Sequence, residues 1–146
     1  MVPAVHGEFV IGRAKRLRDG NDITIASTGV MVSEALAAGE ILFREGIGAR
    51  VLHFPTVKPL DETAAIAAAR QTRGLVTVEE HSVIGGLGEA IAASIAEADA
   101  PAPLRRIGLR DVFGESGTAA DLFDKYGLRA ANIVAAARAL LARSRV

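Results

Sequence analysis

The chain has 146 residues, of which half are hydrophobic and none is cysteine, so it can form one domain with a packed core but no disulfide, thiolate metal site or cysteine nucleophile. Lys plus Arg equal Asp plus Glu at 17 each, and only 4% of the residues are aromatic, which argues against nucleic-acid and acidic-membrane partners and favours self-association. No apolar run approaches the roughly 20 residues that span a bilayer, and no signal-peptide pattern opens the chain, so we expect a soluble, cytoplasmic protein.

The N-terminal part of the chain is expected to contain a linker and two strands. Residues 1–8 show no periodicity and are interpreted as a linker or an added start, and residues 9–146 as one domain. Residues 14–17, AKRL, are few and charged, which suits an edge strand. Residues 22–27, DITIAS, are β-branched without polar alternation, which is typical of a strand covered on both faces.

A helix and a second buried strand follow. The pattern from about residue 31 to residue 44 predicts a helix with Val32, Leu36 and Phe43 on its apolar side, ended by the glycines of EGIG. Residues 49–54, ARVLHF, predict the strand, which leads into a proline-rich loop.

The middle of the chain predicts two more strands and two more helices. Asp61 is expected to cap a helix over residues 62–72, because Asp accepts hydrogen bonds from the first free amides of a helix. Residues 74–80, GLVTVEE, predict a third strand, and residues 85–98 predict the helix after it. The stretch 100–109, APAPLRRIGL, predicts a loop and a fourth strand.

The C-terminal part predicts two helices. Ser116 or Thr118 would cap a short helix that Gly127 ends. The final helix, over residues 131–142, is expected to bury the apolar stripe of Ile133, Val134, Ala137, Leu140 and Leu141. Because four strands alternate with helices, we predict parallel pairing through right-handed crossovers and a three-layer α/β/α sandwich.

The stretch VEEHSVIGGLGEAIA, residues 78–92, places carboxylates, a histidine and glycines at the end of a predicted strand. Its spacing is G-G-x-G, whereas a dinucleotide fingerprint requires G-x-G-x-x-G. Glu89, in the first turn of the next helix, would stabilise that helix but repel an incoming anion. These features argue against a phosphate cradle and against a nicotinamide-binding oxidoreductase fragment.

Glu79, Glu80 and His81 do not form a complete catalytic or metal centre. In an extended segment Glu79 and His81 share one face and Glu80 points to the other, and two ligands on one side are too few for a metal. His81 is interpreted as a hydrogen-bonded histidine at a strand end, or as a polar contact to another subunit or to an active site built by another domain. Ser116 lacks the G-x-S-x-G spacing of a nucleophile, and helix capping explains it. We therefore assign no catalytic, cofactor-binding or metal-binding residue to this chain.

Three glycines within four residues indicate a close approach of backbones. In a helix each costs up to about 1 kcal/mol relative to alanine, so we expect close packing there, either at an interface or inside the domain. The predicted contact surface comprises Glu79, Glu80, His81, Gly85, Gly86, Leu87 and Gly88.

A stand-alone anion-binding module is the alternative use of this end of the sheet, because open α/β sheets bind ligands beyond the carboxyl ends of their strands. Lys58, His81 and Arg110 would supply positive charge for an anionic effector such as a sugar phosphate. The loops predicted at that end are residues 27–29, 55–59, 79–86 and 108–117.

Five stretches of the chain, in order, resemble the C-terminal domain of transketolases. They are ITIASTGVMVSEALAA, ARVLHFPTVKPLD, TVEEHSVIGGLGEAIA, LRRIGLRDVFGESGTAADLFDKYGL and ANIVAAARALL, and the resemblance runs from about Phe9 to the C-terminus. The run EEHSVIGGLG, followed by FGESG and YGL, favours transketolase over two relatives that share the fold. Those relatives are the deoxyxylulose-phosphate synthases and the β subunits of the 2-oxoacid dehydrogenases.

The resemblance implies a five-stranded sheet whose first strand, AKRL, is an antiparallel edge strand. It also implies a parent enzyme that moves two-carbon ketol units between sugar phosphates with thiamine diphosphate and a divalent metal such as Mg. In such enzymes the cofactor lies between two other domains, and the C-terminal domain mostly adds to the dimer. The partners expected from the resemblance are a second copy of the chain, the thiamine-binding domains, or both.

The cofactor motif of that family is missing from this chain. The metal–diphosphate motif begins G-D-G and ends in a pair of asparagines, whereas here residues 18–22, RDGND, predict only a turn and no adjacent asparagines occur. The domain that supplies the activating glutamate is also missing. We therefore expect an excised domain or a remnant of a longer subunit, which alone neither binds thiamine diphosphate nor turns over substrate.

Overall fold

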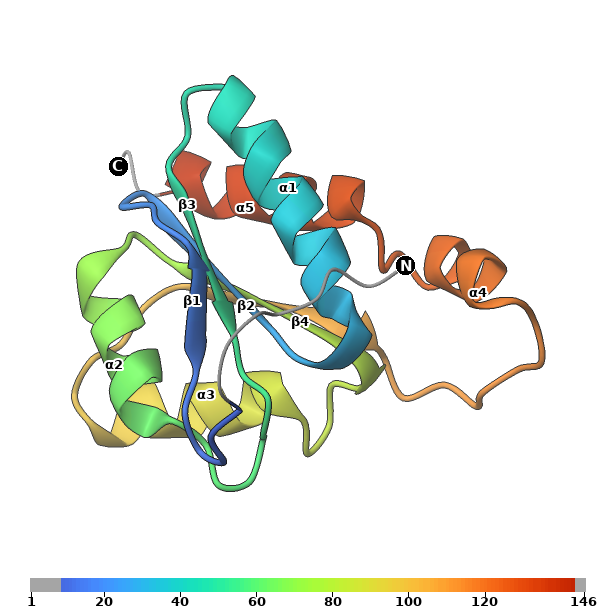
Figure 1. The fold of residues 1–146 in the computed structure, drawn as a ribbon, viewed down its shortest axis with the longest axis horizontal. Helices are drawn as coiled ribbons and strands as arrows, with labels where there is room; N and C mark the ends of the chain where they lie inside the picture. The colour runs from blue at the N-terminus through green and yellow to red at the C-terminus, as the bar shows by residue number, and fades with distance from the viewer. Residues whose placement is uncertain (1–8, 144–146) are drawn as a thin grey trace.

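The computed structural model describes residues 9–143, so the predicted linker over residues 1–8 lies outside the described residues (Figure 1). The strands are β1 (Lys15–Arg18), β2 (Ile23–Ser27), β3 (Ala49–His53), β4 (Leu75–Ser82) and β5 (Leu104–Leu109). The helices are the 3₁₀ turn η1 (Gly29–Met31), α1 (Val32–Arg44), α2 (Glu62–Gln71), α3 (Leu87–Glu97), α4 (Ala119–Lys125) and α5 (Ala130–Arg143). None of the helices within residues 9–143 is long and apolar enough to cross a bilayer.

The five strands form one sheet in the order β1-β3-β2-β4-β5. β2, β3, β4 and β5 pair in parallel, whereas β1 pairs with β3 in the antiparallel direction at the edge. This arrangement confirms the predicted mostly parallel α/β sheet with one antiparallel edge strand.

Helices cover both faces of the sheet, as the three-layer prediction requires. α1 and α5 lie on one face, where they pack against residues such as Ile23 and Ile25 of β2 (Figure 1). α2 and α3 cover the other face, where Ala26 of β2 contributes to a second core cluster with Leu87 and Ile91 of α3. Alternate residues of β2 therefore enter different cores, which explains why the strand lacks polar alternation.

The helix caps follow the predictions in large part. The Asp61 carboxylate accepts a hydrogen bond from the Ala64 amide (3.0 Å) at the start of α2, and the Thr118 hydroxyl accepts one from the Asp121 amide (3.2 Å) at the start of α4. Of the two candidate caps for α4, Thr118 is therefore the one used. The stripe predicted for the last helix is buried in full.

One predicted core residue lies on the surface. Phe43 was expected on the apolar side of α1, but its side chain is 62% exposed and Leu42 is buried in its place. The guanidinium carbon of Arg18 lies 4.9 Å from the centre of the Phe43 ring, a cation–π contact. One position on a helix is a rotation of about 100°, so a shift of one residue moves a side chain from the core to the surface.

One end of the sheet collects the segments that the sequence singled out. β2, β3, β4 and β5 finish there, and antiparallel β1 starts there, because Lys15 pairs with His53. We call this end the carboxyl pole. Between β2 and β4 the chain connections run to opposite sides of the sheet, which makes this position the topological switch point where open α/β sheets usually bind ligands.

Candidate functional site

Glu79 is a buried carboxylate that binds the start of α3. Its side chain is fully buried at the carboxyl pole of β4. Its two oxygens accept hydrogen bonds from the Leu87 amide (2.6 Å) and the Gly88 amide (3.1 Å), the first two amides of the helix. These amides have no partner within the helix, and the helix dipole favours a negative charge beside them. Glu79 therefore does the work of an N-cap side chain, although it lies on a strand.

Glu80 accepts a hydrogen bond from the start of a different helix, on the opposite face of the sheet. Its Oε2 accepts a hydrogen bond from the Val30 amide (3.2 Å), in the turn η1 that leads into α1. Gly29 lies against this carboxylate, since a β-carbon on Gly29 would come within 3.0 Å of Glu80 Oε1. Successive side chains of a strand point to opposite faces, so two adjacent glutamates reach two different helix starts.

This pair of contacts gives a physical reason against a phosphate site at the switch point. Phosphates bind in such folds to free amides at a helix start. Here the chain's own carboxylates already accept hydrogen bonds from those amides, and their negative charge would repel an anion. Glu89 also disfavours an anion here, because its Oε2 accepts a hydrogen bond from the Gly85 amide (2.6 Å) and carries a negative charge.

His81 lies beside Glu79, on the face that the strand alternation predicts. Its Nδ1 lies 3.3 Å from Glu79 Oε2 and 3.1 Å from the Ser82 carbonyl oxygen. Both neighbours are acceptors, so Nδ1 donates its hydrogen to them. The side chain is 47% exposed. The structure thus makes His81 a hydrogen-bonded histidine at a strand end.

Gly85, Gly86 and Gly88 are each required by a different feature of the structure. A β-carbon on Gly86 would lie 2.0 Å from Glu79 Oε2, and one on Gly88 would lie 2.7 Å from the Thr77 hydroxyl oxygen. Both are therefore required by packing inside the domain. Gly85 has a positive φ of 72° and open space around it, so a turn requires it.

The structure separates the seven residues of the predicted contact surface into two groups. Glu79, Gly86, Leu87 and Gly88 are buried within the domain, whereas Glu80, His81 and Gly85 are exposed. A direct contact between this stretch and a partner would therefore be made by the exposed Glu80, His81 or Gly85. Ile84, which is 58% exposed in the same loop, was missed by the sequence reasoning, because an apolar residue between polar and glycine residues can be buried or exposed.

The three candidate anion-binding residues follow three different strands at the carboxyl pole. His81 and Arg110 follow the neighbouring strands β4 and β5, whereas Lys58 follows β3 on the far side of β2. Arg110 donates from Nη2 to the Arg106 carbonyl oxygen (3.2 Å). Within residues 9–143 no hydrogen bond or ion pair links Lys58 to the other two.

The described residues do not fit a metal–diphosphate site. No group of three or more His, Asp or Glu side chains among residues 9–143 could hold a metal ion. The amides at the helix starts beside the switch point already donate hydrogen bonds to Glu79 and Glu80, and the negative charges of these carboxylates would repel a diphosphate. Residues 9–143 therefore offer no set of side chains that fits a metal-bound diphosphate.

An apolar cavity of about 290 Å³ opens at the carboxyl pole, below the segment that follows β5. Its walls are mostly apolar, and Glu80 and Glu115 are the two acidic residues at its edge. The Tyr126 hydroxyl is buried and has no hydrogen-bond partner among the described residues. The lining comprises Val30, Glu80, Leu109, Gly114, Glu115, Ala119, Leu122, Phe123, Tyr126 and Leu128.

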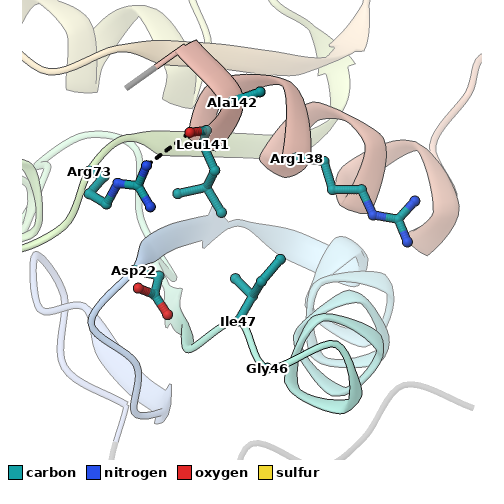
Figure 2. A pocket seen from close by; sticks show the side chains of 7 residues that line it. All are labelled: Asp22, Gly46, Ile47, Arg73, Arg138, Leu141 and Ala142. Atoms are coloured by element: carbon teal, nitrogen blue, oxygen red, sulfur yellow. Dashed lines mark hydrogen bonds between the residues drawn. The ribbon is translucent and has the colours of Figure 1, made fainter. Parts of the chain in front are cut away.

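A second cavity, of about 400 Å³, lies at the opposite end of the sheet, and its polar groups are paired within the chain (Figure 2). Ile47 and Leu141 point toward one another across it, and the Arg73 guanidinium donates to the Leu141 carbonyl oxygen (2.9 Å). Arg138 points away from the cavity and forms an ion pair with Glu45. These contacts tie α5 to the start of the sheet, and the two arginines do not converge on a ligand position.

His53 and Lys15 are neighbours across the β1–β3 pair at the carboxyl pole. Burial lowers the pKa of His53; the Ser27 carbonyl acts in the opposite direction, and the Lys15 charge lowers the pKa further. His53 Nδ1 and Lys15 Nζ are both buried and have no hydrogen-bond partner within residues 9–143. The fold therefore favours the neutral form of His53.

Comparisons with known proteins agree with this structure. A family model described as "Transketolase, C-terminal domain" matches residues 12–133. The 6-deoxy-6-sulfo-D-fructose transketolase subunit SqwH of Clostridium sp. (strain MSTE9) is 49% identical over 142 residues, which are 97% of this chain and 44% of that protein. A 1-deoxy-D-xylulose-5-phosphate synthase of Heliobacterium modesticaldum is 42% identical over 130 residues, which are 89% of this chain and 20% of that protein.

A solved structure described as "Split gene transketolase, inactive beta4 tetramer" has the same fold. It superimposes with a TM-score of 0.90 at 44% identity and covers 97% of this chain and 47% of that one. The chain thus spans less than half the length of each of these three relatives.

Proposed function

The chain belongs to the transketolase C-terminal domain family, and from this premise we propose that it is the non-catalytic assembly domain of a cytoplasmic transketolase. The whole enzyme would transfer two-carbon ketol units between sugar phosphates. Thiamine diphosphate and a divalent metal such as Mg would be held by other domains of that enzyme. Residues 9–146 would form the domain, preceded by a linker over residues 1–8.

One observation carries the assembly role. Seven of the nine large hydrophobic side chains exposed among the described residues lie at the carboxyl pole, before β1 or after β2, β4 and β5. Exposed apolar side chains at one end of a domain are typical of a surface that another protein covers, and here they extend from the edge strand β1 to the edge strand β5. The seven are Phe9, Val10, Ile11, Val30, Ile84, Val112 and Phe113, and the other two, Ile41 and Phe43, lie on α1.

The same face includes the exposed part of the predicted contact surface. Glu80, His81 and Gly85 flank Ile84, and all four residues are exposed. The partner would be a second copy of the chain, the thiamine-binding part of the same enzyme, or both. Two relatives support this kind of partner, since one is called a transketolase subunit and the other is described as a β4 tetramer.

Relatedness to 1-deoxy-D-xylulose-5-phosphate synthase supports a second candidate. The domain would then belong to a thiamine-dependent enzyme that shares this fold but carries out a different transfer. The higher identity and the wider coverage of the transketolase subunit favour the first candidate.

Sedimentation velocity over a wide concentration range tests the assembly role. We expect a concentration-dependent oligomer that Ile84→Asp weakens and Ile41→Asp, a matched change on α1, leaves intact. The same preparation should neither bind thiamine diphosphate in a calorimeter nor convert a ketose and aldose phosphate pair. A chain that stays monomeric at every concentration would contradict self-assembly, leave the thiamine-binding part of the enzyme as the partner, and make the anion-binding module a serious rival.

A further inference from the structure

β5 is an edge strand, because the order β1-β3-β2-β4-β5 places no strand on its outer side within residues 9–143. Residues 104–107 of β5 are only half-buried, whereas every residue of the central strand β2 is buried. The outer side of an edge strand presents N–H and C=O groups to which a strand of another chain can add. An open β5 edge would therefore invite such pairing.

The register between β4 and β5 shows which backbone groups face outward. The Leu75 amide donates to the Pro103 carbonyl oxygen (2.9 Å), and Leu75 is the register partner of Leu104. Backbone polar groups alternate between the two sides of a strand, so those of Arg105 turn toward β4, as the Pro103 carbonyl does. The backbone groups of Leu104 and Arg106 therefore turn outward, to the edge of the sheet.

Two arginine side chains lie on these outward carbonyls. Arg105 Nη1 donates to the Leu104 carbonyl oxygen (3.3 Å), and Arg110 Nη2 donates to the Arg106 carbonyl oxygen (3.2 Å). A strand that added to β5 would have to donate its own amides to the same two oxygens. The two guanidinium groups thus occupy the acceptors that the added strand needs.

From these contacts we infer that Arg105 and Arg110 close the outer edge of β5 to strand addition. Each side chain covers one outward acceptor and places a positive charge where the added strand would lie, and charged side chains are a common protection of edge strands. Arg110, which the sequence presented as a candidate anion contact, thus has a role at the edge of the sheet. This role is independent of the proposed function, since it requires no partner at the carboxyl pole.

The opposite edge of the sheet is protected in a different way. β1 has only four residues, three of which are basic, and its register with β3 shifts between Arg16 and Arg18. A short strand with an irregular register gives an added strand little to pair with. β5 has six residues, and its register with β4 is regular over residues 104–107, so side chains have to protect its edge.

A double variant, Arg105→Thr/Arg110→Thr, opens the edge, because threonine favours strands and is too short to cover the two carbonyls. We expect it to form aggregates that bind thioflavin T at least ten-fold faster than the wild-type chain does. Its formal net charge falls from zero to −2, so charge alone predicts slower association. Arg44→Thr/Arg143→Thr is the matched control, since it removes the same charge from exposed positions on α1 and α5.

A proline at position 106 tests whether β5 is the strand that pairs. Arg106→Pro removes an N–H that faces the open edge, so it blocks an added strand and leaves the hydrogen bonds to β4 in place. Introduced into the double variant, it should return aggregation to the wild-type rate. The change also removes the Arg106 contacts with the Val83 carbonyl oxygen and with Glu89, so urea unfolding checks that the triple variant stays folded.

Hydrogen exchange in the aggregates is a second readout that does not require the proline variant. The outward amides of Leu104 and Arg106 should exchange at least ten-fold more slowly than in the monomer, while β2 keeps its native protection. Loss of protection in β2 would assign the aggregates to unfolded chains and overturn the inference. A folded double variant that aggregates no faster than its control, or a folded triple variant that still aggregates rapidly, would overturn it as well.

Discussion

A β-carbon placed on Gly86 would come within 2.0 Å of Glu79 Oε2, so the buried carboxylate determines that residue 86 is glycine. The backbone of Gly86 is extended, with φ at −98°, and other residues could adopt it. The restriction therefore comes from the side chain of another residue, seven positions earlier on β4. It also means that a substitution at Gly86 disturbs the fold and cannot serve as a clean test of an interface.

We expect Gly86→Ala to lower the free energy of unfolding by about 1–3 kcal/mol, the usual effect of forcing extra volume into a packed site. Gly114→Ala is the control, because no heavy atom lies within 4 Å of the added methyl group. That variant should stay within about 0.5 kcal/mol of the wild-type chain. Urea unfolding of the three proteins measures the difference, and equal stabilities would contradict the close contact.

Glu79→Ala should destabilise the domain more than Glu80→Ala. The first change leaves two buried amides at the start of α3 without an acceptor, which costs about 1–3 kcal/mol. The second removes an exposed hydrogen bond to Val30, whose amide can bind water instead. Glu79→Gln keeps one acceptor oxygen and should lie between the two. The order of the urea midpoints checks this expectation, and a larger loss for Glu80→Ala would contradict it.

Stability should fall as the pH drops below the ordinary pKa of histidine, about 6.5, partly because of His53. Burial lowers the pKa of His53 in the folded chain, so the unfolded chain takes up this proton first as the pH falls. The stability is present above about pH 6.5 and is lost as the pH falls through the lower, folded pKa. For one proton the slope is at most about 1.4 kcal/mol per pH unit.

Urea unfolding between pH 7.5 and pH 5 tests the role of His53. His53→Gln should have a flatter pH profile than the wild-type chain. Lys15→Met should also reduce the loss, because it removes the neighbouring positive charge that helps lower the His53 pKa. Identical slopes in all three proteins would assign the acid sensitivity to other groups.

Arg129→Met should loosen α4 without unfolding the domain. Arg129 donates to Asp124 and to the Ala120 carbonyl oxygen (2.9 Å), and it pairs with Glu34 on α1. The side chains of Arg129 and Glu34 are 33% and 19% exposed and that of Asp124 is 67% exposed, so the loss of global stability should stay near about 1 kcal/mol, while local opening of α4 becomes easier. Hydrogen exchange should become faster over residues 119–126 and stay unchanged in the sheet. Arg138→Met, which removes an ion pair with Glu45 away from α4, should not have this effect.

The strands and helices could be read from the sequence because their signals are local. The β-branched run of β2, the Asp61 cap and the stripe of α5 depend on neighbours two to four residues away, and the structure confirms all three. The alternation along β4 likewise predicted that Glu79 and His81 share a face. The family resemblance added the antiparallel edge strand, which a four-residue charged segment could not establish alone.

The tertiary structure decided which groups meet. The sequence could not indicate that Glu79 binds the start of α3 and Glu80 the turn before α1, because those contacts depend on how helices distant in sequence pack against the sheet. It also could not distinguish the exposed Phe113 from a core residue, since exposure depends on what covers a side chain and not on its type. Local periodicity determines the elements, whereas burial and contact at the carboxyl pole arise only when the four parallel strands end there together.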